Sequence, residues 1–397
     1  MFNDRLERIG DYPFDRLRAL LGPIEPAAGI EPISFALGEP QHPTPDLIRT
    51  TVEANAALWG KYPPMMGTPD ARAAIAAWLT SRYKLPDGMI GDQNIVPVSG
   101  TREALFLIAL AAVPEKIAGK RPVVLMPNPF YQVYAGAAVL SGAEPIFLPA
   151  GPETGFLPDL SAVTPDILER TALAYYCSPA NPQGAIADLE TLKSMIELAR
   201  RHDFLLVSDE CYSEIYDRGV APPPGAAEAC ASLGGSLENV AIFNSLSKRS
   251  SAPGLRVGFV AGDARLIQKF SRLRDYGGAP PPLPLLAAAA ALWRDESHVE
   301  QSRELYRQKF DIAEKHLNGR LGFYRAPGGF YLWLDVGDGE EAAKTLWRDA
   351  AIRVIPGAYL ARTDQNGRNP GNVYIRCALV HDPEITDLAL ERLAKAL

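Results

Sequence analysis

A lysine with chemically suggestive neighbours lies in the segment Asn244-Ser-Leu-Ser-Lys-Arg-Ser-Ser-Ala-Pro-Gly-Leu-Arg256. Ser245 and Ser247 can hydrogen-bond a phosphate, and Arg256 can bind it through two parallel hydrogen bonds. Lys248 would then be placed to form a Schiff base with a carbonyl cofactor. Taken alone, the segment is equally consistent with a polar turn between two strands that carries a solvent-exposed lysine. Whether Lys248 is reactive therefore depends on which other residues surround it.

A carboxylate and a phenol stand close together in Val207-Ser-Asp-Glu-Cys-Tyr212. Asp209 ends an apolar run, and the carboxyl end of such a strand faces the crevice where open α/β sheets bind ligands. This carboxylate can hold a protonated pyridine nitrogen, and Tyr212 can reach a phenolic oxygen of the same ring. The alternative is that Asp209 only caps a helix.

Two further turns carry groups that can bind a ligand. Ser99-Gly100-Thr101 lies between a predicted strand and a predicted helix, where free N–H groups and a hydroxyl make an anion site. An ordinary helix cap is the alternative there. Asn181-Pro-Gln-Gly184 follows a strand, and the Asn181 amide can donate to a ring oxygen or simply shape the turn.

The elements that must position these groups alternate between short apolar strands and longer helical patterns, which indicates an α/β protein. Strands are expected at 94–98, 122–126, 144–147, 172–176, 204–207, 240–243, 257–261, 331–334, 353–355 and 373–377. Helices are expected at 70–83, 102–113, 131–141, 189–202 (with Asp188 as its cap), 297–317, 340–350 and from Pro383 to the end. The Gly- and Pro-rich stretch Gly277–Pro284 is the candidate domain boundary.

Composition narrows the class of protein. The chain has 397 residues, of which 47% are hydrophobic, with a formal net charge of -7. The negative net charge argues against non-specific nucleic-acid binding and against a polybasic membrane contact. No apolar stretch approaches the roughly 20 residues of a spanning helix, and no signal peptide is visible. The scattered cysteines and histidines suggest neither disulfides nor a metal site, and a reducing cytoplasm is expected.

The segments, taken in order, resemble the fold type I pyridoxal 5'-phosphate (PLP) aminotransferases over nearly the whole chain. The resemblance implies PLP on Lys248, with Asp209 at the pyridine nitrogen and Tyr212 at the ring oxygen, as the catalytic residues. It implies further cofactor contacts by Ser99, Gly100, Thr101, Tyr131, Asn181, Ser245, Ser247, Arg256 and, from the neighbouring subunit, Tyr62. Substrate contacts are implied for Gly38, Asn181 and Arg376, the last gripping the α-carboxylate.

The resemblance also implies an architecture. A large domain over residues 45–285 is expected to hold a mostly parallel, seven-stranded sheet, and residues 1–44 with 286–397 to form a small domain. A homodimer with shared active sites is expected, with small-molecule amino-acid and 2-oxo-acid substrates and no nucleic-acid or membrane partner. Tyr131 lies in Pro129-Phe-Tyr-Gln-Val-Tyr134, which is similar to the family's Pro-x-Tyr-Pro-x-Tyr except that Gln132 replaces proline.

Within this family, three stretches resemble the succinyldiaminopimelate aminotransferases of lysine biosynthesis: 127–134, 247–256 and 258–263. The implied reaction exchanges an amino group between N-succinyl-diaminopimelate and 2-oxoglutarate. Tyr276–Pro284 lacks the His and Gln expected there, which leaves open an aminotransferase of aspartate, aromatic or branched amino acids. A PLP-dependent lyase would share every cofactor residue. Arg249 and Lys61 are possible contacts for the far end of the substrate, although no motif selects them.

Overall fold

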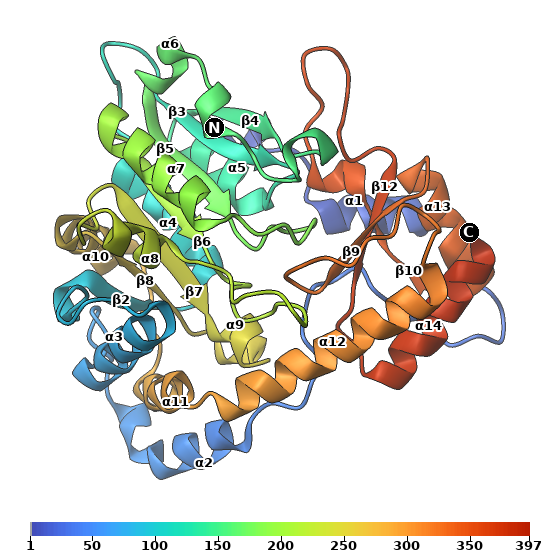
Figure 1. Cartoon of the computed structure of the whole chain (residues 1–397), viewed down its shortest axis with the longest axis horizontal. Coiled ribbons are helices and arrows are strands. Elements are labelled where there is room, and N and C mark those ends of the chain that lie inside the picture. Colours follow the sequence, from blue (N-terminus) through green and yellow to red (C-terminus); the bar gives the residue numbers. More distant parts are fainter. Residues whose placement is uncertain (1) are drawn as a thin grey trace.

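The computed structural model describes residues 2–397 as two layered units that the long helix α12 joins (Figure 1). The larger unit is built on a seven-stranded sheet, in which β7, β6, β5, β3 and β4 run parallel and β8 runs antiparallel to both neighbours. The spatial order is β2 (Ile95–Val98), β8 (Gly258–Gly262), β7 (Val240–Ser245), β6 (Leu205–Asp209), β5 (Thr171–Cys177), β3 (Val123–Asn128) and β4 (Glu144–Pro149). The predicted mostly parallel sheet is therefore confirmed.

Alternate residues of each central strand face opposite sides of this sheet. In β3, Val123 and Leu125 pack in one core, whereas Val124 and Met126 pack in the other. Because helices cover both faces, the strand is apolar along its length instead of alternating with polar residues. Polar side chains therefore gather where the strands end, as Asp209 does after β6 and Ser245 after β7.

The covering helices fall into two layers. One face of the sheet carries α3 (Pro69–Tyr83), α7 (Leu189–His202), α8 (Ala226–Ser232) and α11 (Leu283–Arg294). The other face carries α4 (Thr101–Ala112), α5 (Gln132–Leu140) and α10 (Ala264–Gly277). The unit also contains α2 (Asp46–Ala54), which packs on α11, and the short helices α6 (Pro165–Leu168) and α9 (Leu246–Arg249).

The smaller unit combines the N-terminal segment with the C-terminal part of the chain. Strand β1 (Ile33–Ser34) pairs in parallel with β10 (Ile352–Arg353). A three-stranded antiparallel sheet has the order β11 (Ile355–Pro356), β12 (Tyr374–Ala378), β9 (Tyr331–Asp335). The helices of this unit are α1 (Pro13–Leu21), α12 (Ser297–Leu317), α13 (Gly339–Ala350) and α14 (Pro383–Ala396).

Some helices match their predicted bounds, whereas α1, α2, α8 and α10 were not predicted, and two further details differ from the expectation. Helix α7 spans Leu189–His202 as predicted, because the Asp188 side chain accepts from the Thr191 N–H at 2.8 Å. The apolar run from Leu283 continues through Pro284 as helix α11, since proline in the first turn removes no intrahelical bond. The strand predicted at 353–355 is split at Val354 between two sheets.

The packing of α11 bears on where the domains divide. Leu286, Leu292 and Trp293 are buried in the same core as Trp78 of α3, and the rings of Trp78 and Trp293 lie 4.7 Å apart. We therefore propose that the large domain runs from about residue 45 to Arg294, instead of ending at 285. The small domain then begins with the approach to α12. Among the helices described between residues 2 and 397, none has the length and apolar character to cross a membrane.

Candidate active site

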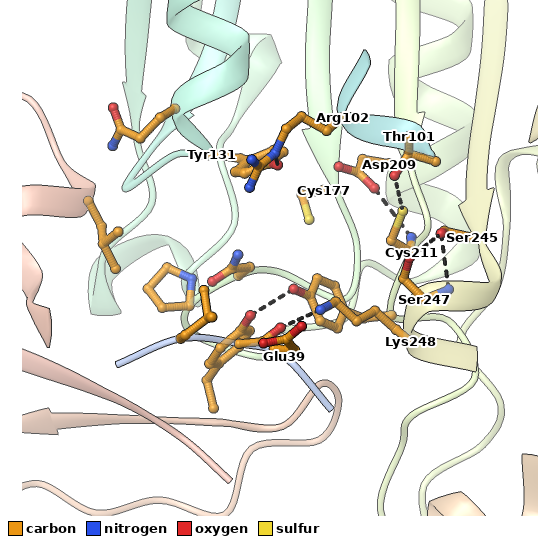
Figure 2. Close-up of a pocket in the computed structure, with 18 of the residues that line it drawn as sticks. Glu39, Thr101, Arg102, Tyr131, Cys177, Asp209, Cys211, Ser245, Ser247 and Lys248 are labelled. Atoms are coloured by element: carbon orange, nitrogen blue, oxygen red, sulfur yellow. Dashed lines mark hydrogen bonds between the residues drawn. The ribbon is translucent and has the colours of Figure 1, made fainter. Parts of the chain in front are cut away.

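Lys248 lines a cavity of about 520 Å³ between the two units. Strand β7 ends at Ser245, whose hydroxyl caps α9 by accepting from the Ser247 N–H at 3.1 Å. This tight turn places Lys248 at the cavity beside Ser247 and near Glu39 (Figure 2). The Lys248 amine donates a hydrogen bond to the Gly38 carbonyl oxygen and lies 5.3 Å from the ring centre of Phe330. Burial lowers the pKa of Lys248 to about 8, which favours the neutral, nucleophilic amine.

Asp209 is the last residue of β6 and lines the same cavity. Tyr134 Oη donates to Asp209 Oδ2 at 2.5 Å, and the Cys211 N–H donates to Oδ1 at 3.3 Å. Burial raises the pKa of Asp209, while both donors favour its charged form. The carboxylate is thus held in one orientation at the carboxyl edge of the sheet. Sequence reasoning gave Tyr134 no role; its position one helical turn after Tyr131 was the available signal.

Tyr212 meets a residue of the small domain that sequence reasoning treated only as part of a strand. The hydroxyls of Tyr212 and Tyr331 lie 2.8 Å apart. A Cβ atom on Gly38 would lie 2.1 Å from the Tyr331 hydroxyl, so only glycine lets the N-terminal segment pass this close. Gly38, Tyr212 and Tyr331 therefore form one wall of the cavity beside Lys248.

Arg376 of β12 and Asn181, both expected to contact the substrate, lie side by side. Arg376 Nη1 donates to Asn181 Oδ1 at 3.1 Å, and Nη2 donates to the Ala36 carbonyl oxygen at 2.8 Å. The guanidinium also lies over the Tyr331 ring, 4.5 Å from its centre. Its buried Nε has no hydrogen-bond partner in the described part of the chain.

Groups suited to an anion gather at the N-terminus of α4. A Cβ atom on Gly100 would lie 2.0 Å from Arg256 Nη2, so the glycine backbone and the guanidinium approach each other directly. The hydroxyls of Ser245 and Ser247 lie 3.0 Å apart, and Thr101 Oγ1 lies 3.3 Å from the Cys211 sulfur. Together with the unpaired N–H groups of the first turn of α4, they form an anion cradle.

Two of the predicted cofactor residues are placed differently from the rest. The Ser99 hydroxyl donates to the Ala279 carbonyl oxygen at 2.6 Å, so within this chain it is already engaged. Tyr62 is 99% exposed and lies outside the cavity. Its predicted contact with a neighbouring subunit requires such exposure and stays a prediction. Arg249, considered above, is buried beside Trp78 and Trp293 and bonds to the Leu292 carbonyl, away from the cavity.

Tyr131 enters the cavity from the start of α5 and meets an arginine that sequence reasoning did not select. Arg102 Nε donates to the Tyr131 hydroxyl at 2.8 Å (Figure 2). Burial raises the pKa of Tyr131 to about 12, and the nearby guanidinium opposes that rise. The only signal in the sequence was the position of Arg102 directly after the Ser99-Gly100-Thr101 turn.

The cavity therefore surrounds one amine with an anion cradle, a carboxylate for a ring cation and a guanidinium for a carboxylate. This arrangement defines an enzyme class in which a lysine-bound carbonyl cofactor acts on amino acids.

Comparisons with known proteins agree with that class. The model of the family "Aminotransferase class I and II" matches residues 30–393. An LL-diaminopimelate aminotransferase of Moorella thermoacetica is 31% identical over 99% of this chain and 97% of that protein. The crystal structure of an aminotransferase from Neisseria meningitidis superposes with a TM-score of 0.93 at 40% identity over 99% of both chains. That of the aminotransferase AspB from Helicobacter pylori gives 0.88 at 36% identity, covering 97% of this chain and 98% of that one.

The chain belongs to the class I and II aminotransferase family, whose enzymes use PLP. The residues present fit that cofactor. Because residue 100 is glycine, the Arg256 guanidinium can lie directly against the backbone of the cradle, where it could bind a phosphate together with the backbone N–H groups. Asp209 offers a buried carboxylate to a pyridine nitrogen, and Lys248 offers an amine of lowered pKa to the aldehyde.

Proposed function

We propose that this aminotransferase moves an amino group between a diaminopimelate and 2-oxoglutarate, with N-succinyl-diaminopimelate as the preferred donor. The stretches at 127–134 and 247–263 support the succinylated substrate through their resemblance to that group of enzymes. The relatives named LL-diaminopimelate aminotransferases support the diaminopimelate skeleton and make the free amino acid the second candidate. Both donors and 2-oxoglutarate carry a second carboxylate far from the reacting carbon.

Besides Arg376, and Arg256 in the anion cradle, a third guanidinium lies in the cavity, and this observation carries the proposal. Arg102 lines the cavity together with Arg376, and among the described residues no carboxylate lies within ion-pair distance of Arg102. Its Nε donates to the Tyr131 hydroxyl, and its terminal nitrogens form no ion pair among the described residues. An arginine fork suits a carboxylate, so Arg376 would take the α-carboxylate and Arg102 the distal one.

A substitution of Glu39 can distinguish between the two candidate amino donors. It is exposed, lines the cavity and lies in no ion pair among the described residues. Free LL-diaminopimelate carries a distal ammonium that Glu39 could pair with, whereas succinylation converts that ammonium to an amide. Glu39→Gln should therefore reduce the rate with LL-diaminopimelate and leave the rate with the succinylated donor nearly unchanged.

Each residue of the cavity has a proposed task. PLP, when bound, supplies an aldehyde and a ring that accepts electrons from the substrate's α-carbon. Lys248 would hold the cofactor, and its Nζ, when free, would take the proton from the substrate's α-carbon as a general base. Asp209 would keep the pyridine nitrogen protonated, and Tyr212 would donate to the ring oxygen. Arg376 and Asn181 orient the substrate by its α-carboxylate, and Ser245, Ser247, Thr101 and Arg256 hold the phosphate.

Initial rates measured side by side test the substrate. We expect N-succinyl-LL-diaminopimelate with 2-oxoglutarate to exceed both LL-diaminopimelate with 2-oxoglutarate and glutamate with an aromatic or aliphatic 2-oxo acid. Arg102→Gln should cut the first two rates about tenfold or more, because a hydrogen bond to a charged group is worth about 1.5–3 kcal/mol. A faster reaction with monocarboxylic 2-oxo acids in the wild type would exclude the diaminopimelate assignment and leave only the family's reaction.

We further propose that the enzyme is a cytoplasmic homodimer with shared sites. Its four cysteines are free thiols, in keeping with a reducing compartment. The exposure of Tyr62 supports a role at a neighbouring subunit, and two-fold dimers are the commonest oligomers.

A further inference from the structure

A completely buried lysine stands outside the proposed catalytic set. Lys309 of α12 is 0% exposed, and no carboxylate in the described chain lies within ion-pair distance of it. Its Nζ donates to the His381 carbonyl oxygen at 2.8 Å, contacts His42 Nε2 at 2.7 Å and lies 4.4 Å from the ring centre of Tyr306. Removing an ammonium from water without a counter-ion is costly, so a lysine here does not serve stability.

The partners of Lys309 set the state of His42. Since a lysine amine donates, His42 Nε2 accepts, and the ring proton then lies on Nδ1, which faces Ser302 Oγ at 3.3 Å. Ser302 Oγ lies 3.0 Å from Ser251 Oγ, three residues beyond Lys248. Burial lowers the pKa of Lys309 to about 7 and that of His42 to about 3, so His42 stays neutral. A continuous polar chain thus joins α12 to the turn that carries the reactive lysine.

His42 also ends a segment that covers Lys248. At the other end, the Ala36 carbonyl accepts from Arg376, and between them the Gly38 carbonyl accepts from Lys248. Beside His42, the Gln41 N–H donates to the Val380 carbonyl oxygen at 3.2 Å, whereas Leu37 in the middle of the segment is 47% exposed. A second series of contacts also leads from Lys309 to Lys248, because the Tyr306 ring stacks on Phe330 and the Phe330 ring centre lies 5.3 Å from the Lys248 amine. Segment 36–42 is therefore fixed over the cavity mainly by its two ends.

We propose that Lys309 is a positioning residue: through His42 it holds segment 36–42 over Lys248 in the conformation that receives the substrate. This inference rests on the proposed roles of Lys248 and Arg376. It explains why a cation that costs stability occupies the core between α12 and the N-terminal segment. An apolar residue of similar length would pack there but could not hold the His42 ring by hydrogen bonding.

The test compares Lys309→Met with Lys315→Met. Lys315 lies on the same helix, its side chain is 62% exposed, and it pairs with Asp387 at the surface. Hydrogen exchange is measured on the cofactor-free proteins, so the result does not depend on catalysis. We expect amides of segment 36–42 to exchange about tenfold faster in Lys309→Met, because local opening responds to lost local contacts. The amides of strand β6 should stay as protected from exchange as in the wild type, and the melting temperature should not fall.

Steady-state kinetics of the PLP-bound enzyme are the second measurement. We expect Lys309→Met to raise the KM for the amino donor about fivefold or more with kcat within about twofold, as for loss of binding without loss of chemistry. His42→Gln, which can still accept from Lys309, should behave like the wild type. His42→Leu, which leaves α12 intact, should reproduce the faster exchange and serves in place of Lys309→Met should that variant not fold.

Three results would overturn the proposal. Unchanged exchange in segment 36–42 of both Lys309→Met and His42→Leu would show that the contact does not hold the segment. Faster exchange throughout the protein with a lower melting temperature would show a general structural role. An unchanged KM despite faster exchange in segment 36–42 would show that the segment's conformation does not affect substrate binding. Should the protein lack aminotransferase activity, the exchange result would still stand, so the two proposals fail separately.

Discussion

The phenol of Tyr134 donates a 2.5 Å hydrogen bond to Asp209 Oδ2, and its ring stacks on Tyr175 with centroids 4.3 Å apart. Asp209 is 5% exposed, so this donor is one of few groups that can stabilise its charge. The stack fixes the phenol, and the phenol fixes the carboxylate. The residue expected to face the pyridine nitrogen therefore depends on a tyrosine for its orientation.

Tyr134→Phe should keep the stack and lose only this hydrogen bond. We expect kcat/KM to fall about tenfold, because a hydrogen bond to a charged group contributes about 1.5–3 kcal/mol. Asp209→Asn should cost about a hundredfold or more, since the electrostatic partner itself is lost. Tyr175→Phe is the matched control: it removes the other hydroxyl of the stack, which donates to the Leu105 carbonyl oxygen. An equal loss in both phenylalanine variants would assign the effect to packing.

The amine of Lys248 should react at a lower pH than the lysines at the surface. Its pKa of about 8 follows from burial, so the neutral amine forms between about pH 7 and 9. In the cofactor-free protein, labelling by an amine reagent such as trinitrobenzenesulfonate, mapped by peptide mass, should rise with a midpoint near pH 8 at Lys248. Exposed Lys315 is the internal reference. A midpoint above about 10 at Lys248 would contradict the lowered pKa.

The same pKa has a consequence for stability with a definite sign. Because the folded pKa lies below the unfolded value, the protonated amine opposes folding. This penalty is fully present below about pH 8 and disappears as the pH rises towards about 10.4, the value of an unfolded lysine. Lys248→Met should therefore melt higher than the wild-type apoprotein at pH 7, with a difference that shrinks by pH 10. A constant difference would show that packing alone changed.

Arg376→Lys should impair both half-reactions. A lysine cannot donate to Asn181 and Ala36 and still present a planar fork to a carboxylate. We expect KM for donor and acceptor to rise together by about tenfold or more while PLP stays bound, as judged by its absorbance. Arg320→Lys, a change at an exposed arginine, should have no effect. A defect confined to one substrate would show that Arg376 does not grip the carboxylate common to both.

Tyr62 should act in the site of a second subunit. Its side chain is 99% exposed in the single chain, although the family resemblance gives it a cofactor contact. Inactive Tyr62→Ala and Lys248→Ala proteins, mixed under subunit exchange, should regain about a quarter of wild-type activity, because half of the dimers then hold one intact site. Mixing either variant with itself is the control. Absence of rescue in a mixture that sedimentation shows to exchange would exclude the shared site.

The sequence by itself determined the class of this protein. Strands with both faces buried are apolar throughout, and a helix such as α7 carries its own capping residue at Asp188, so these elements are encoded locally. The order of the short motifs around Asp209, Lys248 and Arg376 was enough for the family, which the comparisons confirm. Each of these signals lies within about a dozen residues of chain, where spacing and residue type suffice.

Only the tertiary structure decided which groups meet. Tyr134 and Asp209 are 75 residues apart, Tyr212 and Tyr331 are 119 apart, and His42 and Lys309 are 267 apart. Nothing local marks such pairs, because each contact depends on how helices cover the sheet and how the small domain closes on the large one. Burial then sets the chemistry: a serine-flanked lysine in a turn becomes a reactive amine only when the packed walls around it lower its pKa.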